Sequence, residues 1–313
     1  MRFLFVAPHP DDLEFNIPSI MFVIAHCMNP KQYSEKPEIL KALEISKKYL
    51  TTRNEVNFQF KTVSMTRGEM AQLTDEVGST LKAAEIRSQE LINGQLILMG
   101  KMPDFLGFFD GYVEVSEQSI KKVYDYIIRM RPDYILGPEP IFVYYDHKDH
   151  VNTGKILYFV LKRMVKAKKK GDLDITIPKL FYYQSIHNHW FFPRLPVFEE
   201  FLINALKAHK TQSFTVNKKG IEYNIGLLEK FFKGLKVQHS YKGEALRYQP
   251  IPENPDVPWK YKVKQFSDLP MRKRIVHYVL RKLRAKIASH NYTERYEKYY
   301  DGKIPESISG TWN

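Results

Sequence analysis

The chain has 313 residues, of which 43% are hydrophobic and 14% aromatic, so it can bury a sizeable core. Its net charge is +13, and its single cysteine, Cys27, excludes an internal disulfide and suits a reducing compartment. No run of about 18 apolar residues occurs, which argues against a transmembrane helix, and the amino terminus lacks the pattern of a signal peptide. We therefore expect a cytoplasmic globular protein.

Strand and helix signals alternate along the chain. Strands are predicted at residues 2–6, 58–65, 134–136 and 179–184, and helices from residue 17 and over 37–49, 81–91, 116–130, 153–168 and 196–209. Such alternation predicts an α/β fold, a Rossmann-like and mostly parallel sheet with helices on both faces.

Two polar clusters follow predicted strands. Pro8 and Pro10 keep the first loop out of a helix and hold His9 on a stiff turn. Asp11 and Asp12 then fall at the start of the next helix, where unpaired N–H groups and the helix dipole favour carboxylates. The second cluster contains His147, Asp149 and His150. Ligands gather beyond the carboxyl ends of parallel strands in an open α/β sheet, so we expect the two clusters to meet.

The residue types predict a metal centre. His9, Asp12 and His150 would form the three-ligand set of a catalytic zinc ion, or of another divalent transition metal, with a fourth position for water. The metal would lower the pKa of that water and polarise a carbonyl group. Asp11 would be the general base. His147 is better placed to stabilise an oxyanion or to protonate a leaving group than to be a fourth ligand.

The His-Pro-Asp-Asp-x-Glu stretch from His9 and the His-x-Asp-His stretch from His147 resemble the LmbE-like, or PIG-L, family of zinc-dependent N-deacetylases. This family includes enzymes that act on N-acetylglucosaminyl inositols and related N-acetylglucosaminides. Three further segments are similar to family motifs: Thr66-Arg67-Gly68-Glu69, the Arg-x-x-Glu-Leu stretch from Arg87, and residues 105–111. The resemblance is close from residue 2 to about residue 154. It is looser beyond, where residues 208–212 and 243–245 match weakly.

The resemblance implies a role for each site residue. The zinc ligands would be His9, Asp12 and His150 and the base Asp11, as the residues themselves suggest. The sugar and its substituent would be held by Arg87 and Asp110, with Glu69 as a further candidate. Tyr145 would help His147 at the oxyanion. Apart from the resemblance, the position of Asp149 between the two histidines suggests that it could orient one of these imidazoles from behind.

The sequence departs from the family in two places. Ile17-Pro18-Ser19 stands where family members carry a Gly-Gly pair, which alters the local backbone. The segment over residues 29–57 is longer than expected, and its predicted amphipathic helix could roof the site.

Two basic segments account for the whole excess of positive charge. Residues 161–170 hold six Lys or Arg and residues 271–286 hold seven, with no acid in either. Pro250, Pro252, Pro255 and Pro258 suggest a boundary. We predict a deacetylase domain over residues 1–250 and a basic extension over 251–313. The amphipathic helix over 271–288 could pack on the main domain or lie on an anionic membrane, which suits a lipid-linked substrate.

The predicted function is removal of an acetyl group from an N-acetylglucosamine-type amino sugar or its conjugate, small or lipid-linked. The alternative is an anionic-surface or nucleic-acid binding protein on a degenerate scaffold, but the five intact residues His9, Asp11, Asp12, His147 and His150 argue against degeneration. A phosphoesterase is disfavoured because only one mononuclear ligand set is evident. The sequence contains no nucleic-acid motif, and it leaves the oligomeric state open.

Overall fold

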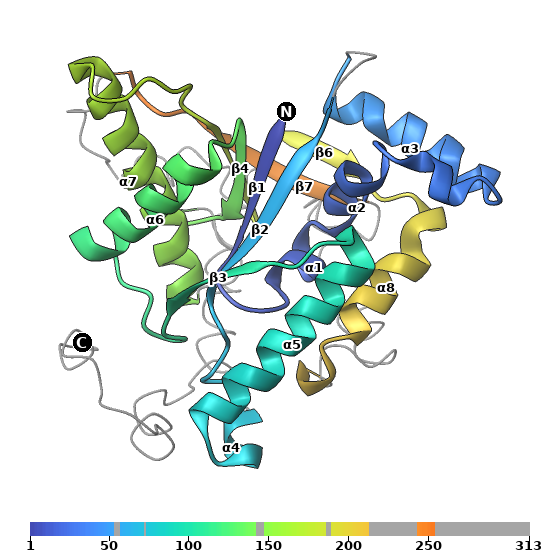
Figure 1. Ribbon diagram of the computed structural model, residues 1–313, viewed down its shortest axis with the longest axis horizontal. Helices are drawn as coiled ribbons and strands as arrows, with labels where there is room; N and C mark the ends of the chain where they lie inside the picture. The colour runs from blue at the N-terminus through green and yellow to red at the C-terminus, as the bar shows by residue number, and fades with distance from the viewer. Residues whose placement is uncertain (53–56, 72, 142–146, 186–188, 213–242, 254–313) are drawn as a thin grey trace, which may run out of the picture.

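The computed structural model describes residues 1–52, 57–71, 73–141, 147–185, 189–212 and 243–253. Tyr145 and the predicted basic helix over residues 271–288 lie outside these ranges, as does most of the predicted extension. The described residues form one central sheet with helices on both of its faces (Figure 1).

The sheet confirms the predicted α/β fold. Its strand order is β3-β2-β1-β4-β5-β7-β6 in the described residues. Strands β1 to β5 pair in parallel, whereas β7 is antiparallel to β5 and β6. The strands are β1 (Arg2–Ala7), β2 (Gln59–Thr66), β3 (Asp104–Phe108), β4 (Tyr134–Pro138), β5 (Lys179–Tyr183), β6 (Trp190–Pro193) and β7 (Gly243–Gln249).

The helices divide between the two faces of the sheet. One face carries α6 and α7, whose apolar residues share a core with β1, β2, β4 and β5. The other carries α2, α3, α5 and α8 (Figure 1). The bounds are α1 (Asp12–Asn16), α2 (Pro18–His26), α3 (Pro37–Leu50), α4 (Leu73–Val77), α5 (Thr80–Met99), α6 (Glu117–Met130), α7 (Lys148–Lys170) and α8 (Glu199–Lys207), with 3-10 turns at Pro30–Tyr33, Pro196–Phe198 and Lys210–Gln212.

The departure at Ile17-Pro18-Ser19 splits the first helix in two. Ile17 leaves the helical conformation, as a residue before proline tends to do, and Pro18 begins α2. The carboxylate of Glu244 on β7 accepts hydrogen bonds from the N–H groups of Ser19 (2.5 Å) and Ile20 (2.9 Å). A buried side chain from the antiparallel part of the sheet thus caps α2.

The described part of the long segment before β2, residues 29–52, does not roof the predicted site. Its helix α3 buries Ile39, Ala42 and Leu43 in the core of one sheet face. The last turn of α3 lines a hollow together with Met1 and Asp133, which precede β1 and β4. This part of the insertion therefore lies at the amino edge of the sheet, opposite the carboxyl edge where the site was predicted.

The sheet has its switch point between β1 and β4. The chain runs outward from β1 to β2 and β3 on one side, then returns to β4 and continues to β5 on the other. Gly154 lets α7 pack closely on the end of β4, because a Cβ there would overlap the Pro138 carbonyl oxygen. The crevice beyond the carboxyl ends of β1 and β4 is where such sheets bind ligands.

None of the helices in the described ranges combines the length and the apolar character needed to cross a bilayer.

Candidate metal centre

Asp12 lies between two imidazoles that come from distant parts of the chain. Its Oδ2 is 3.3 Å from Nδ1 of His9, and its Oδ1 is 3.1 Å from Nε2 of His150. The same Asp12 carboxylate accepts the backbone N–H of His9 at 2.8 Å. All three residues are buried. The predicted meeting of the two clusters therefore occurs, and it places the three predicted ligands in mutual contact.

The loop that carries His9 is fixed by the neighbouring strand. The N–H and the hydroxyl of Thr66, at the end of β2, both donate to the Pro8 carbonyl oxygen, at 3.1 Å and 2.9 Å. Asp12 begins α1 directly after this loop, as the sequence predicted.

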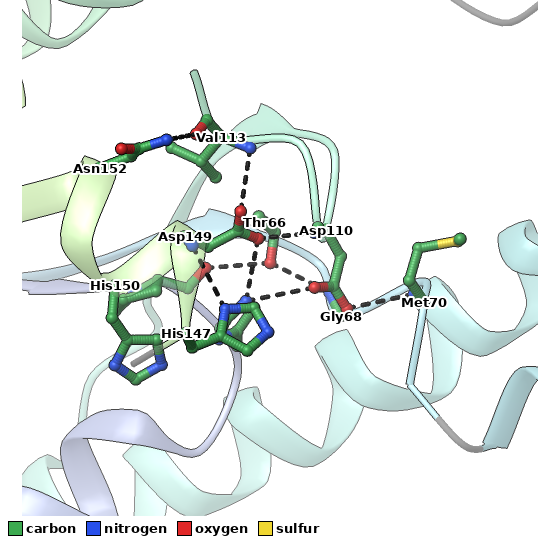
Figure 2. Close-up of polar contacts among 12 residues, drawn as sticks. Thr66, Gly68, Met70, Asp110, Val113, His147, Asp149, His150 and Asn152 are labelled. Atoms are coloured by element: carbon green, nitrogen blue, oxygen red, sulfur yellow. Dashed lines mark hydrogen bonds and ion pairs between the residues drawn. The ribbon is translucent and has the colours of Figure 1, made fainter. Parts of the chain in front are cut away.

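The second nitrogen of His9 faces two carboxylates. Nε2 is 3.2 Å from Asp110 Oδ1 and 3.1 Å from Asp149 Oδ2. Asp149 itself accepts the N–H group of Gly111 at 2.6 Å. It also accepts that of Val113 at 3.1 Å (Figure 2). Burial alone would lower the pKa of His9, but the carboxylates, Asp110 foremost, raise it well above its usual value. Asp149 thus contacts the imidazole of His9 through Nε2, while Nδ1 of the same ring faces Asp12.

His147 is the N-cap residue of α7. Its Nδ1 accepts the backbone N–H of Asp149 at 3.2 Å, which starts the helix five residues earlier than predicted. Figure 2 shows His147, Asp149 and His150 coming from the same turn of the chain. The His147 ring lies 4.6 Å from the ring of His9, centroid to centroid, and 5.5 Å from that of His150. Burial, reinforced by the charge of His9, lowers the pKa of His147 to about 4.

Asp11 points to a different partner from Asp12. Its Oδ1 is 3.2 Å from the guanidinium of Arg87, which also donates to the Pro10 carbonyl oxygen at 2.6 Å. Asp11 has a φ of 112°, an uncommon backbone conformation for a residue with a side chain. Burial raises the pKa of Asp11 to about 6, although Arg87 opposes that rise.

Arg87 reaches Asp11 across a glycine. Gly68 has a φ of +73°, and a Cβ there would lie 2.6 Å from a terminal nitrogen of Arg87. The Thr66-Arg67-Gly68-Glu69 segment therefore leaves room for the guanidinium. This gives a physical reason for glycine at position 68.

Glu69 and Asp110 are tied into the loops around the site. Glu69 accepts the N–H groups of Asp110 and Arg67, each at 3.1 Å, and Asp110 accepts that of Met70 at 3.1 Å. Burial, followed by the charge of Asp110, raises the pKa of Glu69 to about 7. Burial opposes ionisation of Asp110 as well, but His9 keeps the Asp110 pKa below its usual range.

The donor set fits a divalent cation. Two groups of three residues have ligand atoms that all lie within 4.8 Å of one another: His9, His147 and His150, and His9, Asp110 and Asp149. The predicted set is connected instead through Asp12, which contacts both His9 and His150. Buried carboxylates need compensating positive charge. Three buried carboxylates, those of Asp12, Asp110 and Asp149, lie within 3.3 Å of the His9 ring. Imidazole with carboxylate suits zinc and other borderline ions.

Gln184 contacts one of the predicted ligands, although nothing in the sequence pattern selects it. It follows β5 directly, and its Oε1 lies 2.8 Å from Nδ1 of His150. A glutamine after a strand carries no recognisable signal. Only the pairing of β5 with β4 brings it to the carboxyl edge.

Glu14, the last residue of the first motif, faces away from the metal ligands. It accepts a hydrogen bond from Gln95 at 2.6 Å and lies 3.7 Å from Nε2 of His209, and all three residues are fully buried.

The comparisons with known proteins agree with the resemblance seen in the motifs. Residues 44–161 match the PIG-L family, described as GlcNAc-PI de-N-acetylase. The matched region contains Arg87, Asp110, His147 and His150 and begins after the first motif. Among curated proteins, none matches this chain. The match over residues 44–161 confirms the predicted recognition of a PIG-L, or LmbE-like, domain.

Three solved structures are similar to the fold. N,N′-diacetylchitobiose deacetylase from Pyrococcus horikoshii aligns with a TM-score of 0.58 and 19% identity, covering 80% of this chain and 84% of that one. The conserved protein TT1542 from Thermus thermophilus aligns with a TM-score of 0.51 and 21% identity, covering 82% of this chain and 97% of that one. GalB, a 4-carboxy-2-hydroxymuconate hydratase from Pseudomonas putida, aligns with a TM-score of 0.54 and 12% identity. The alignment covers 81% of this chain and 98% of that one. A deacetylase and a hydratase share this fold, so the reaction has to be argued from the site.

Proposed function

Because this chain carries a PIG-L (LmbE-like) family domain, we propose that it is a metal-dependent deacetylase that hydrolyses the acetamide of an N-acetylglucosamine-type amino sugar or its conjugate. One observation supports this most directly. Asp12 contacts both His9 and His150, while the adjacent Asp11 turns to Arg87. This difference in partners supports Asp12 as the ligand and Asp11 as the base.

His9, Asp12 and His150 would hold the cation. Nδ1 of His9 and Nε2 of His150 both face Asp12, and these are the nitrogens we assign as ligands. When bound, zinc would polarise the acetamide carbonyl and make the attacking water more acidic.

Asp11 would accept the proton of the water that attacks the acetamide carbon. Its raised pKa makes it a stronger base than an exposed aspartate, yet still ionised at neutral pH. Arg87 orients its carboxylate. The C–N bond then breaks, and the proton held by Asp11 passes to the departing amine, giving acetate and the free amino sugar.

His147 would donate a hydrogen bond to the developing oxyanion. Its Nδ1 already accepts the Asp149 N–H, so in the neutral ring the hydrogen is on Nε2. The lowered pKa keeps the ring neutral at pH 7, which favours a hydrogen-bond donor over a cationic acid. The sequence left open whether His147 stabilises the oxyanion or protonates the leaving group, and this geometry favours the first role. We propose Tyr145 as a second donor to the oxyanion from the family resemblance alone.

The amino sugar is proposed as the substrate because of the family description, GlcNAc-PI de-N-acetylase. Arg87, Asp110 and Glu69 would line its pocket. Since Asp110 and Glu69 are also bonded to loop amides, they would act partly by fixing the shape of that pocket.

The proposal is tested by measuring acetate release from a panel of N-acetylglucosaminides, including an inositol conjugate, with the purified protein loaded with zinc. Release that requires the metal and disappears on chelation is expected. Zinc binding without acetate release from any member of the panel would contradict the proposed reaction.

A further inference from the structure

The two nitrogens of His150 face opposite partners. Nε2 lies 3.1 Å from Asp12 Oδ1, and Nδ1 lies 2.8 Å from Gln184 Oε1. His150 and Gln184 are both buried, with 1% and 7% of their surface exposed. An imidazole that binds a cation through Nε2 carries its hydrogen on Nδ1, and that N–H needs an acceptor. The side-chain oxygen of Gln184 occupies the position of such an acceptor.

The backbone of Gln184 is unusual for its residue type. It has a φ of 62°, in the left-handed region that residues with side chains seldom adopt. Gln184 comes directly after Tyr183, which pairs with Pro138 on the neighbouring strand β4. It therefore sits at the carboxyl edge of the sheet beside the site. Unfavourable conformations that persist at buried positions cluster at functional sites.

His9 is held in a comparable way. Its Nδ1 faces Asp12 while its Nε2 contacts Asp149, whose oxygens are fixed by the N–H groups of Gly111 and Val113. Both imidazoles that face Asp12 therefore have an oxygen behind them. Asp149 was expected from the sequence for this purpose, whereas Gln184 was not.

We propose that Gln184 is a positioning residue for the metal centre. Its side-chain oxygen accepts the Nδ1–H of His150, which fixes the tautomer and the ring plane, so that Nε2 presents its lone pair to the cation shared with His9 and Asp12. This inference rests on the proposed function, because it assumes that these three residues bind a metal.

The test compares variants that keep or remove the acceptor. Gln184→Glu retains an oxygen at the same reach, and Gln184→Met has a similar length without a comparable acceptor. The dissociation constant for Zn²⁺ is measured by competition with a chromophoric chelator. We expect Gln184→Met to bind zinc about 10–100-fold more weakly than the unmodified protein, and Gln184→Glu to stay within about threefold. The visible spectrum of the Co²⁺-loaded protein should change in Gln184→Met and not in Gln184→Glu, since only the former alters the geometry of one ligand.

A second variant covers the case in which Gln184→Met does not fold. Asparagine tolerates a positive φ better than glutamine, but it is one methylene shorter. Gln184→Asn should therefore fold at least as well and still lose zinc affinity. The matched control is Arg131→Asn, which changes another residue of positive φ (47°) that precedes β4, at the opposite edge of the sheet. That variant should bind zinc normally.

Folded Gln184→Met or Gln184→Asn protein that binds zinc as tightly as the unmodified chain would overturn the inference and leave the proposed function intact. An unmodified chain that binds neither Zn²⁺ nor Co²⁺ would overturn both.

Discussion

The guanidinium of Arg87 lies 3.2 Å from Asp11 Oδ1, and it spans the space above Gly68 to reach the Pro10 carbonyl oxygen. The proposed base is thus held by a cation from α5, a helix that contributes no metal ligand. The residue that orients the proposed base is therefore distinct from the residues that would bind the metal.

Arg87→Gln should move the acidic limb of the pH profile upward. Asp11 must be ionised to accept a proton, so kcat/KM falls as pH drops through the pKa of Asp11. Burial raises that pKa and Arg87 lowers it, so removal of Arg87 lets it rise further. A nearby opposite charge lowers a carboxyl pKa by about 1–3 units, so a shift of about 1 pH unit or more is expected. A limb that stays in place in Arg87→Gln would show that Arg87 does not set the ionisation of the base.

Asp11→Asn should lower kcat by about 10²–10⁴-fold while the zinc content is unchanged. Asparagine tolerates the positive φ at this position, so the backbone need not move. Zinc content is measured by elemental analysis beside kcat. Asp125→Asn, on the exposed face of α6, serves as the control and should keep both values. Loss of zinc from Asp11→Asn would instead make Asp11 a ligand.

Gly68→Ala should displace Arg87, since the new methyl group would overlap its side chain. We expect a loss of about 1–3 kcal/mol in the free energy of unfolding, measured with urea, together with reduced kcat. Gly78→Ala is the matched control. It imposes the same positive-φ strain, at +68°, but its methyl group would meet nothing within 4 Å. Equal losses in both variants would mean that backbone strain, and not contact with Arg87, explains the effect.

Zinc should stabilise the protein through Asp12. A ligand at 100 times its dissociation constant stabilises the folded state by about 2.7 kcal/mol, so Tm should rise when zinc is added to chelator-treated protein. Asp12→Asn removes the charge that the two imidazoles share and should abolish most of that rise. An undiminished rise in Asp12→Asn would place the cation elsewhere, for example among His9, Asp110 and Asp149.

The sequence predicted the parallel half of the fold because its strands and helices carry local signals. Pro37 marks the start of α3, and Ser116 caps α6 by accepting the N–H of Ser119. Two other strands, β3 at one edge of the sheet and β7 beside the opposite edge strand β6, carry weaker signals. Strand β3 contains Gly107 with a positive φ, and β7 forms only by antiparallel pairing with β5 and β6.

The same distinction holds within the site. His9, Asp12 and His150 were predicted from their residue types because metal ligands are a small chemical set. Gln184 and Glu244 could not be predicted, since their functions depend on which segment the fold brings opposite them. Helix α7 begins earlier than expected because an imidazole, His147, acts as its cap.

Helix α7 carries His150 in its first turn and Lys168, Lys169 and Lys170 in its last. At about 1.5 Å per residue, those two ends are about 30 Å apart. An anionic bilayer held by the lysine end would therefore meet the protein on the side remote from the reaction centre. A substrate that stays anchored in the bilayer by its lipid could then reach the proposed metal centre only if the protein bound the membrane through another surface. A substrate released from the bilayer would have to diffuse to the opposite side of the protein.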